Sequence, residues 1–419
     1  MLNLEAMITR FRFFLFTVLL FAAQASFAQT YHYYFGNIHA HSSYSDGTKD
    51  GAHTGVLKPA DCFKYAKSAQ HFDFLGISEH NHLQARMHLT SYAKGLAEAT
   101  AANQDGKFVC LYGMEYGVIK NGGHVIIYSF DQLIGWEPGN YTVFSAKNDY
   151  SHLFQLVADH PGAFATLAHP APTDYNDLIS KPYDPTIDQA VKGVAISSGP
   201  AFSTAEDYSD RAPIKYYGYY KKLLALGYHV GPTMDHDNHY TTFGHMSPTR
   251  TVLLSQVLSR DSLLAAYRAG RFYASEDWDT QVDFRVNGQP MGSRLKGATA
   301  LQLTATVNDP DPGDHIKSIQ LWCGQPGSGE APKVLKTFMG QASFQLPLTL
   351  KAGERYYYFL EITQMDGDRI ITSPIWATSK QNEDGQGPAQ TISPDSSRVS
   401  PAPGGANHPT KKKSKPIQP

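Results

Sequence analysis

Residues 36–47 read Gly-Asn-Ile-His-Ala-His-Ser-Ser-Tyr-Ser-Asp-Gly, in which a His-x-His pair precedes an aspartate in a Ser- and Gly-rich turn. His39 and His41 are two residues apart, so in an extended strand their side chains point to the same side. Asp46 can fold back over the same space because Ser and Gly favour a tight turn. Two imidazoles and a carboxylate that converge after a strand are typical of the start of a metal site. A His-x-His pair on a solvated strand is the alternative, and the later part of the chain decides between the two.

Ligand-type side chains recur where later apolar segments begin or end. They are Glu79 and His80, Glu115 after an expected strand over residues 107–112, His124, His169, and Asp237 with His239. Each alone has an ordinary structural explanation, such as a solvated carboxylate or a half-buried histidine. In one cleft without cations, the carboxylates would repel one another and lose hydration. With the first three ligands the groups number ten, more than one tetrahedral ion uses. The sequence therefore predicts two or three divalent ions that share bridging carboxylates.

Short apolar strands alternate with helices between residues 30 and 278. The expected helices cover residues 59–69, 89–102, 151–159, 212–226 and 260–270. Such alternation is typical of parallel βα units, in which functional groups collect at the carboxyl ends of the strands. We therefore expect one α/β barrel-like domain over residues 30–278. From Val282, apolar and polar residues alternate between turns such as Asp309–Gly313, which predicts a β-sandwich over residues 280–378.

The N-terminal segment has the pattern of an export signal. Arg10 and a second arginine precede an apolar run, Phe13–Ala23, which is too short to span a bilayer comfortably. Ser26 and Ala28 are the small residues expected before a cleavage site, so we expect a signal peptide over residues 1–28. An uncleaved anchor is the alternative. Cleavage would leave a periplasmic or secreted protein with no stable membrane insertion.

Composition restricts the partners and ligands of this chain. Charged residues make up 18% of the sequence and the formal net charge is −2, so no basic field indicates nucleic acid binding. Cys62, Cys110 and Cys323 are too few and too far apart for a disulfide framework or a Cys-rich zinc site. Nitrogen and oxygen ligands must therefore hold any metal. Residues 379–419 are rich in Pro, Gly, Ser and Lys, which predicts a disordered tail.

Taken in order, these clusters resemble the successive motifs of the PHP (polymerase and histidinol phosphatase) superfamily of metallohydrolases. The matching segments are His39-Ala40-His41, Ser45-Asp46-Gly47, Phe74–Asn81, Gly113-Met114-Glu115, His124, Ala168-His169-Pro170 and Asp237-Asn238-His239. The resemblance implies a distorted (β/α)7 PHP barrel with two or three metal ions at its open end. It is closest to an exported branch with a small β-domain after the barrel, here the expected Ig-like β-sandwich. Relatives of that branch include esterase and carbamate-hydrolase types.

The resemblance also implies a role for each ligand. The matching metal positions are His39, His41, Glu115 and His169 for a first set, Asp46, His80 and His124 for a second, and Asp237 and His239 for the closing Asp-x-His. Glu115 would be the bridging, catalytic carboxylate, and the ions would be Zn, Mn or Fe. Two features depart from the family: Glu79 stands where Asp is usual, and Asp235-His236 is an alternative register for the closing motif. The spacing favours Asp237 and His239.

The activity that this resemblance implies is metal-dependent hydrolysis of a small-molecule ester by activated water, with a phosphoesterase as the leading case. His236 is a candidate general acid, and His82 is an alternative to it. A phosphate is usually bound by Arg or Lys, for which Lys49, Arg86 and Arg250 are the nearest candidates. Because few basic residues flank the clusters, a carboxyl ester, carbamate or amide substrate stays open. A non-catalytic, metal-loaded protein that binds a surface or a glycan is the alternative from a different class.

Overall fold

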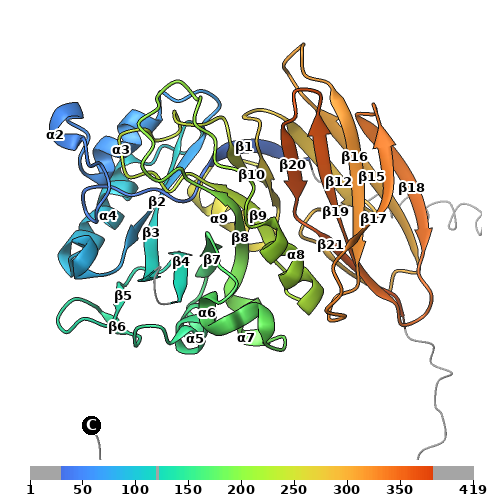
Figure 1. Cartoon of the computed structure of the whole chain (residues 1–419), viewed down its shortest axis with the longest axis horizontal. Coiled ribbons are helices and arrows are strands. Elements are labelled where there is room, and N and C mark those ends of the chain that lie inside the picture. Colours follow the sequence, from blue (N-terminus) through green and yellow to red (C-terminus); the bar gives the residue numbers. More distant parts are fainter. Residues whose placement is uncertain (1–29, 119–121, 381–419) are drawn as a thin grey trace, which may run out of the picture. The chain divides into compact units, whose positions relative to one another are not determined.

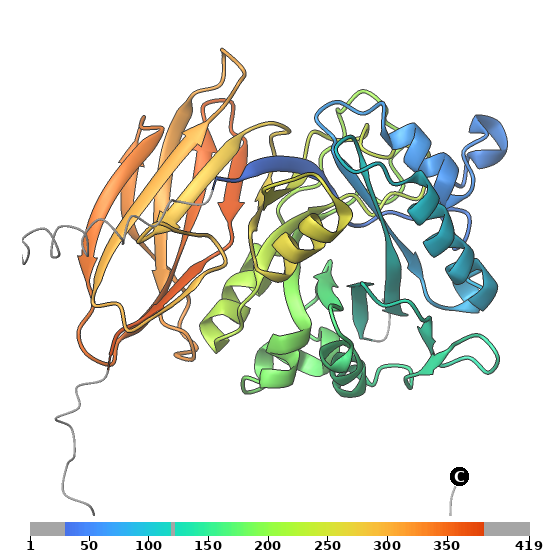
Figure 2. The same ribbon diagram turned by 180° about the vertical axis from the view of Figure 1, so that it is seen from behind.

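The computed structural model describes residues 30–118 and 122–380 (Figures 1 and 2). The expected signal peptide, residues 1–28, lies outside the described residues, and so does the expected disordered tail beyond Lys380. All described residues belong to one compact unit. Among them, no helix is long and apolar enough to cross a membrane.

A large mixed sheet runs through the described residues. Its strands are β1 (His32–Asn37), β2 (Phe74–His80), β3 (Val109–Val118), β4 (Gly123–Tyr128), β7 (Phe164–Ala168), β8 (Val191–Ser198), β9 (Gly231–Asp235), β10 (Arg250–Ser255), β11 (Phe272–Ser275), β14 (Arg294–Lys296), β16 (Ile316–Gly324), β17 (Lys333–Met339), β19 (Arg355–Gln364), β20 (Arg369–Thr372) and β21 (Ile375–Thr378). The order of this 15-stranded sheet is β14-β21-β19-β20-β11-β10-β1-β2-β3-β4-β7-β8-β9, with β16 beside β19 and β17 beside β16.

This sheet shows that the expected (β/α)7 PHP barrel is wrong. A βα barrel needs parallel neighbours joined by helical crossovers of a dozen or more residues. Here β3 pairs antiparallel with β4, β4 with β7, and β10 with both β1 and β11. The strand expected to end at Tyr112 continues to Val118, and β4 begins at Gly123.

Helices cover the sheet but are fewer and shorter than a regular βα repeat requires. They are α2 (Gly51–Thr54), α3 (Pro59–Ala66), α4 (Leu89–Ala102), α5 (Tyr150–Asp159), α6 (Asp174–Asp177), α7 (Pro185–Ala190), α8 (Tyr217–Leu226) and α9 (Arg260–Arg268), with 3-10 turns η1 (Leu83–Ala85) and η3 (Leu178–Ser180). Helix α3 packs on β2, α4 on β3, α5 on β7, α7 and α8 on β8, and α9 on β10. The prediction of a helix over residues 89–102 is confirmed. The helix expected from Ala212 begins only at Tyr217, because the residue before Pro213 is biased away from helical geometry.

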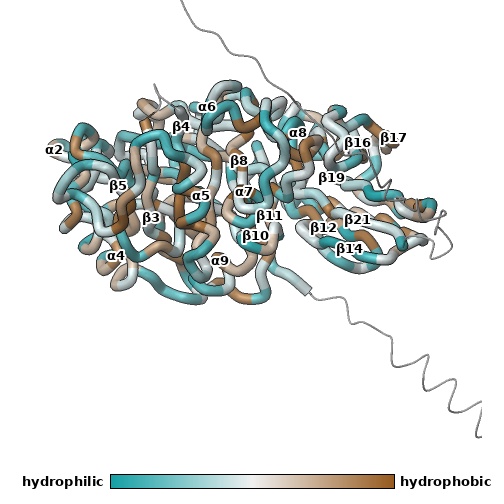
Figure 3. The backbone as a smooth tube through the Cα atoms, turned by 90° about the horizontal axis from the view of Figure 1, so that it is seen from below, coloured by the Kyte–Doolittle hydropathy of each residue, from teal (hydrophilic) through white to brown (hydrophobic). Residues whose placement is uncertain are grey.

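The C-terminal strands form the two layers expected of a sandwich, but one layer is not separate from the rest. A four-stranded sheet contains β13 (Gln289–Pro290), β12 (Gln281–Val286), β15 (Ala300–Asn308) and β18 (Ser343–Thr349). Its buried side chains, such as Phe284 and Leu303, share a core with Leu321 and Leu360 of the facing strands. Burial alternates along β12 and β15, and Figure 3 shows both hydrophilic and hydrophobic segments around β12. The facing layer continues into the large sheet, because β20 pairs antiparallel with β11.

The sheet curves so that its first and last parallel strands end side by side. Beyond β1, His39 O accepts a hydrogen bond from Asp237 N at 2.8 Å, and His41 N donates to Asn238 O at 3.2 Å. Closer to the sheet, Met234 N donates to Thr251 Oγ1 at 3.0 Å, which ties β9 to β10. The segments that follow β1 and β9 therefore face each other at one edge of the sheet.

Gly36 provides a test of this strand arrangement. In the parallel register it lies opposite Phe74, and a Cβ there would meet Phe74 O at 2.3 Å. We expect Gly36→Ala to lower the free energy of unfolding by about 1–3 kcal/mol through overpacking, as measured by urea denaturation. Gly218→Ala is the matched control, since Gly218 of α8 has no atom within 4 Å of an added Cβ. A Gly36→Ala protein as stable as wild type would contradict the β1–β2 register.

Candidate metal centre

Strand register brings four of the predicted ligands together. His80, the last residue of β2, pairs with Glu115 in the parallel β2–β3 ladder. Across the β3–β4 hairpin, Gly117 pairs with His124, and Gly117 is two residues from Glu115 and on the same face. Strand β4 in turn runs beside β7, which His169 directly follows. Glu115 therefore lies inside a strand rather than after one, with an imidazole on each neighbouring strand.

The remaining ligands come from the segments after β1 and β9, and two of the predicted ligands have an unusual backbone conformation. His39 and His41 follow β1, and Asp237 and His239 follow β9. Asp237 has φ 53° and His169 has φ 31°, in the left-handed region that residues other than glycine rarely adopt. Such conformations cost about 1–3 kcal/mol each and concentrate at functional sites.

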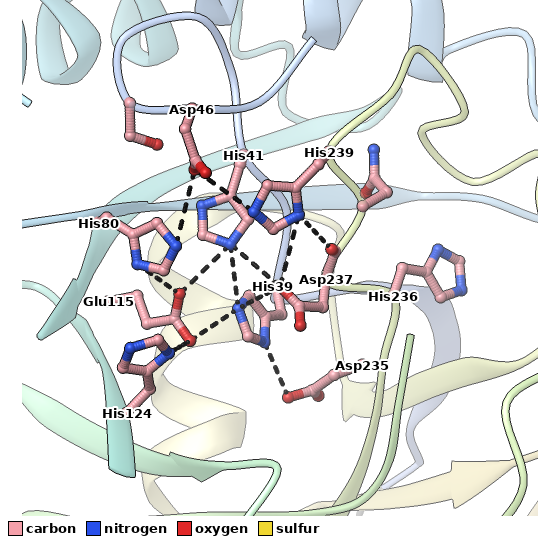
Figure 4. Close-up of polar contacts among 12 residues, drawn as sticks. His39, His41, Asp46, His80, Glu115, His124, Asp235, His236, Asp237 and His239 are labelled. Carbon is pink, nitrogen blue, oxygen red and sulfur yellow. Dashed lines mark hydrogen bonds and ion pairs between the residues drawn. The ribbon is translucent and has the colours of Figure 1, made fainter. Parts of the chain in front are cut away.

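The structure brings all nine predicted metal ligands into one buried cluster, and Figure 4 shows these ligands apart from His169. Eight of them fall into three overlapping groups. The inner group is His39, His41, Glu115 and Asp237; the rim group is His41, Asp46, His80 and His239; and the strand group is His80, Glu115 and His124. His169 lies beside the strand group, with Nε2 3.2 Å from Glu115 Oε1. Asp46 and Asp237 have side chains 31% and 15% exposed, so the cluster opens on their side.

Distances within the inner group suit a shared metal ion. His39 Nε2 and His41 Nε2 are 3.3 Å apart, and they lie 3.2 and 3.1 Å from Asp237 Oδ1. Glu115 Oε1 is 3.2 Å from His39 Nε2, and Oε2 is 3.3 Å from His41 Nε2. Metal–nitrogen bonds of about 2.0–2.1 Å around a tetrahedral ion place neighbouring donor atoms about 3.3 Å apart. The donor set therefore fits a divalent cation.

Several close pairs in the strand group are not hydrogen bonds. His124 Nδ1 lies 2.8 Å from Glu115 Oε1, and His80 Nδ1 lies 3.0 Å from Oε2. Both ring nitrogens and Glu115 Oε2 are nevertheless buried atoms with no hydrogen bond of acceptable geometry. These nitrogen and oxygen atoms lie close together without a proton shared between them, so their lone pairs can be directed at one common position. Such positions are where a cation is held.

Electrostatics in the cluster are dominated by burial and by carboxylate–imidazole attraction. Burial raises the pKa of Glu115, but His124, His39 and His80 together hold it well below its usual range. Burial lowers the pKa of His41, but its hydrogen bond to Asp237 and the nearby Glu115 charge raise it to about 9. The cluster thus has a strong demand for positive charge. A metal ion supplies that charge in place of protons.

Asp237 and His239, the pair that the spacing favoured for the closing motif, both lie in the cluster. Asp235, from the alternative pair, has a different position. Asp237 lies within the inner group, whereas Asp235 Oδ2 is 3.4 Å from Nδ1 of His39, on the far side of that ring. A carboxylate behind a ligating histidine fixes its tautomer and orientation. Sequence spacing alone could not separate a ligand from the residue that orients one.

The structure does not bring His236, the predicted general acid, to the cluster. His236 is fully buried, and its Nε2 donates to Thr249 O at 2.9 Å. Burial and the Arg250 charge lower its pKa to about 3. Figure 4 shows the His236 ring turned away from the cluster. The ring packs against Phe72 instead, so its role is structural.

Glu79 anchors the loop that carries Asp46 and is not a ligand. Along β2, Glu79 and His80 point to opposite faces. The fully buried Glu79 carboxylate accepts hydrogen bonds from Ser42 N at 3.2 Å and from the hydroxyls of Ser42 and Ser45. Gly47 completes the turn, because a Cβ there would meet His41 O at 2.2 Å. Glu79, which stands where Asp is usual in the PHP motifs, thus holds the segment from His39 to Asp46 in place through Ser42 and Ser45.

The basic residues proposed for phosphate binding have different positions. The Arg250 guanidinium is fully buried and donates to backbone carbonyl oxygens, including those of Ser247 and Gln70. It cannot contact a substrate. Lys49 Nζ, in contrast, lies 3.2 Å from Asp46 Oδ2, at the open side of the cluster.

A pocket of about 720 Å³ adjoins the cluster on this open side. His169 and Asp237 belong to its wall, together with Pro170, Lys215 and Tyr216. Tyr219 and Ile179 add further apolar surface. The pKa of Tyr216 is raised by burial and by the Asp237 charge, so its hydroxyl stays protonated. The other lining residues belong to no recognisable sequence motif. Only their position beside His169 and Asp237 in the structure identifies them as candidates for substrate binding.

Comparisons with known proteins do not assign a family. No protein-family model matches the sequence. A stretch of 177 residues is 28% identical to an uncharacterized protein of Chlamydia trachomatis, covering 37% of this chain and 27% of that protein. The chain thus spans well under two thirds of that curated relative. The resemblance to the PHP superfamily stays a prediction.

Two solved structures are each similar to about a quarter of this chain. Superoxide reductase (neelaredoxin) from Ignicoccus hospitalis is 14% identical, with a TM-score of 0.18 over 24% of this chain and 81% of that one. The sixth fibronectin type III domain of a human fibronectin type III domain containing protein is also 14% identical, with a TM-score of 0.19 over 25% of this chain and 89% of that one. Likenesses at these scores carry no argument about this chain.

Glu79 offers a test of how the metal centre is supported. Glu79→Ala leaves the Ser42 and Ser45 donors buried without an acceptor, so we expect a loss of about 2–3 kcal/mol in unfolding free energy, together with weaker metal binding. Glu79→Gln should lose less, because the amide oxygen can accept from Ser42 while the amide nitrogen donates to Ser45. Denaturant titration with metal analysis checks both variants. Equal stability of wild type and Glu79→Ala would rule out this anchoring role.

Proposed function

We propose that this chain is a metal-dependent hydrolase that cleaves a small phosphate ester. The observation that carries the proposal is the arrangement around Glu115, where the close nitrogen–oxygen pairs with His80 and His124 are not hydrogen-bonded. Such donors bind a common ion rather than one another. The order of the motifs, which is similar to that of the PHP metallohydrolases, adds support.

The donors favour at least two ions, of zinc, manganese or iron. A neutral imidazole has one free lone pair, since its other nitrogen carries a proton. His41 and His80 each belong to two groups, so each can serve one ion at a time. If His41 binds the ion of the inner group, that ion has His39, Glu115 and Asp237 as further donors. If His80 binds the ion of the rim group, that ion also has Asp46 and His239, so each ion has at least three donors. Glu115 with His124 and His169 would hold a third. Imidazole with carboxylate suits these transition metals better than calcium or magnesium.

Bound ions of this kind supply Lewis acidity and a water molecule that can attack at neutral pH. The chain's own groups hold and orient the reactants. Glu115 stays ionised because the surrounding imidazoles keep its pKa low. Asp237 and His169 connect the cluster to the pocket, so a substrate in the pocket has its reacting group beside the ligands. The protonated Tyr216 hydroxyl and the Lys215 ammonium in the same wall can bind the substrate's oxygens.

A carboxyl ester, carbamate or amide is the second candidate substrate, and the character of the pocket favours it. Pro170, Ile179 and Tyr219 give the wall beside the cluster apolar surface that suits a hydrophobic acyl or alcohol part. Lys49 and Lys215 are the two basic residues placed to contact a phosphate. Phosphate selectivity would therefore depend on these two lysines and on the metal ions.

Activity on a panel of p-nitrophenyl esters tests the proposal. We expect hydrolysis of p-nitrophenyl phosphate that chelation abolishes and Mn²⁺ or Zn²⁺ restores. His41→Ala removes a donor shared by two groups and should lower kcat/KM by on the order of 10²–10³-fold. His53→Ala, at an exposed histidine of α2, is the matched control and should retain full activity.

The other outcomes discriminate the alternatives. Faster cleavage of the acetate or carbamate ester, with the same metal dependence, would favour the second candidate. Turnover that survives both chelation and His41→Ala would place the activity elsewhere and contradict the proposal. Bound metal without hydrolysis of any ester would favour a non-catalytic binding protein.

A further inference from the structure

A second cluster of carboxylates lies where β11 leads into the C-terminal strands. Asp277 and Asp279 belong to the segment between β11 and β12, and Asp309 directly follows β15. One carboxylate oxygen from each of the three lies within 4.8 Å of the other two. None of these residues belongs to the histidine cluster. The sequence indicated only a turn at Asp309.

Asp277 and Asp279 are buried and Asp309 is half-buried. Asp277 Oδ1 accepts hydrogen bonds from Asp279 N at 2.8 Å and Thr280 N at 3.2 Å, whereas the Asp279 carboxylate is weakly compensated. Asp277 and Asp279 are each 5% exposed, and burial of like charges is costly. Burial and the neighbouring Asp277 charge raise the pKa of Asp279 to about 7. Its ion-pair partner is His71, 3.8 Å away with a side chain 45% exposed, which is a weak counterion at neutral pH. The nearby Arg250 directs its N–H groups to backbone carbonyls.

The amide of Gln364 is an independent sign of a ligand. Its side chain is fully buried at the end of β19, and Nε2 lies 3.2 Å from both Asp277 Oδ2 and Thr280 Oγ1 and also contacts Asp309. The amide oxygen of Gln364 has no hydrogen-bond partner, and neither has the buried Oδ1 of Asp279. Oxygen and nitrogen of an amide can exchange positions by a simple flip. A flip would aim the unpaired oxygen at the carboxylates.

We propose that Asp277, Asp279 and Asp309 bind a calcium ion, with the Gln364 amide oxygen as a further ligand. Every donor in this set is an oxygen, which is the preference of hard cations, in contrast to the imidazole-rich metal centre. Ca²⁺ takes six to eight oxygens at about 2.3–2.6 Å, so ligand atoms up to about 5 Å apart are normal around it. The three carboxylate oxygens lie within that distance of one another. Mg²⁺ needs a tighter octahedron.

A cation here would connect three separate parts of the chain. Asp277 and Asp279 lie in the segment between β11 and β12. Asp309 is the first residue of the β15–β16 connection, and Gln364 is the last residue of β19. The ion would offset the repulsion among the carboxylates and fix these segments to one another. The site is therefore structural and independent of the proposed hydrolase activity.

Terbium luminescence tests the site, because Tb³⁺ accepts the oxygen ligands of Ca²⁺ and emits when a nearby tryptophan absorbs light. Trp278 lies between the two buried aspartates in the sequence. We expect tryptophan excitation of the full chain to give Tb³⁺ emission that added Ca²⁺ displaces. Asp279→Asn should weaken Tb³⁺ and Ca²⁺ binding on the order of tenfold or more. Asp261→Asn, an exposed acid in the first turn of α9, should leave both unchanged.

One further variant and melting measurements keep the result decisive. Trp278→Phe should remove most of the emission while the melting temperature still rises with Ca²⁺, and any emission left reports Tb³⁺ bound elsewhere. In EGTA, Asp279→Asn should melt at a higher temperature than wild type, because it removes one of the repelling charges, and it should gain nothing from Ca²⁺. The proposal is overturned if Ca²⁺ neither displaces Tb³⁺ nor raises the wild-type melting temperature. It is also overturned if Asp279→Asn responds to both ions as wild type does.

Discussion

The burial of one carboxylate among imidazoles is the constraint on which the rest of this structure depends. Glu115 is fully buried in the middle strand of β2, β3 and β4, and five histidine side chains lie within 3.3 Å of its oxygens. A lone charge in such a place would be strongly destabilising. The register of β2, β3 and β4 supplies His80 and His124, and the segments after β1 and β7 supply the others. The fold therefore serves to assemble positive charge around one acid.

The ligands were predictable from sequence because each is a chemically distinctive residue at the edge of an apolar segment. All nine predicted metal ligands converge, and the His-x-His pair lies on one side as the period of a strand requires. What the sequence could not separate was a ligand from the group that supports it. Glu79, Asp235 and His236 have the same side-chain chemistry as ligands, yet their contacts are with Ser42, His39 and Thr249. Only three-dimensional contacts distinguish these roles.

The fold was predictable in its elements and not in its connectivity. Local patterns gave α4 and the alternating strands of the C-terminal part, because helix and strand periods are read within one segment. The (β/α)7 barrel failed at residues 109–128, where a hairpin replaces a helical crossover. The pairing of β20 with β11 was also missed, since no local signal reports which distant strand will be a neighbour. The aspartates of the proposed calcium site meet for the same non-local reason.

X-ray diffraction from crystals of the full chain, recorded on both sides of the zinc, manganese and iron absorption edges, tests the central claim most directly. We expect at least two anomalous peaks, one among the donor atoms of the inner group and one among Asp46, His80 and His239. No such peak in crystals grown with these metals, or peaks outside the cluster with the imidazoles hydrogen-bonded to one another, would contradict the account.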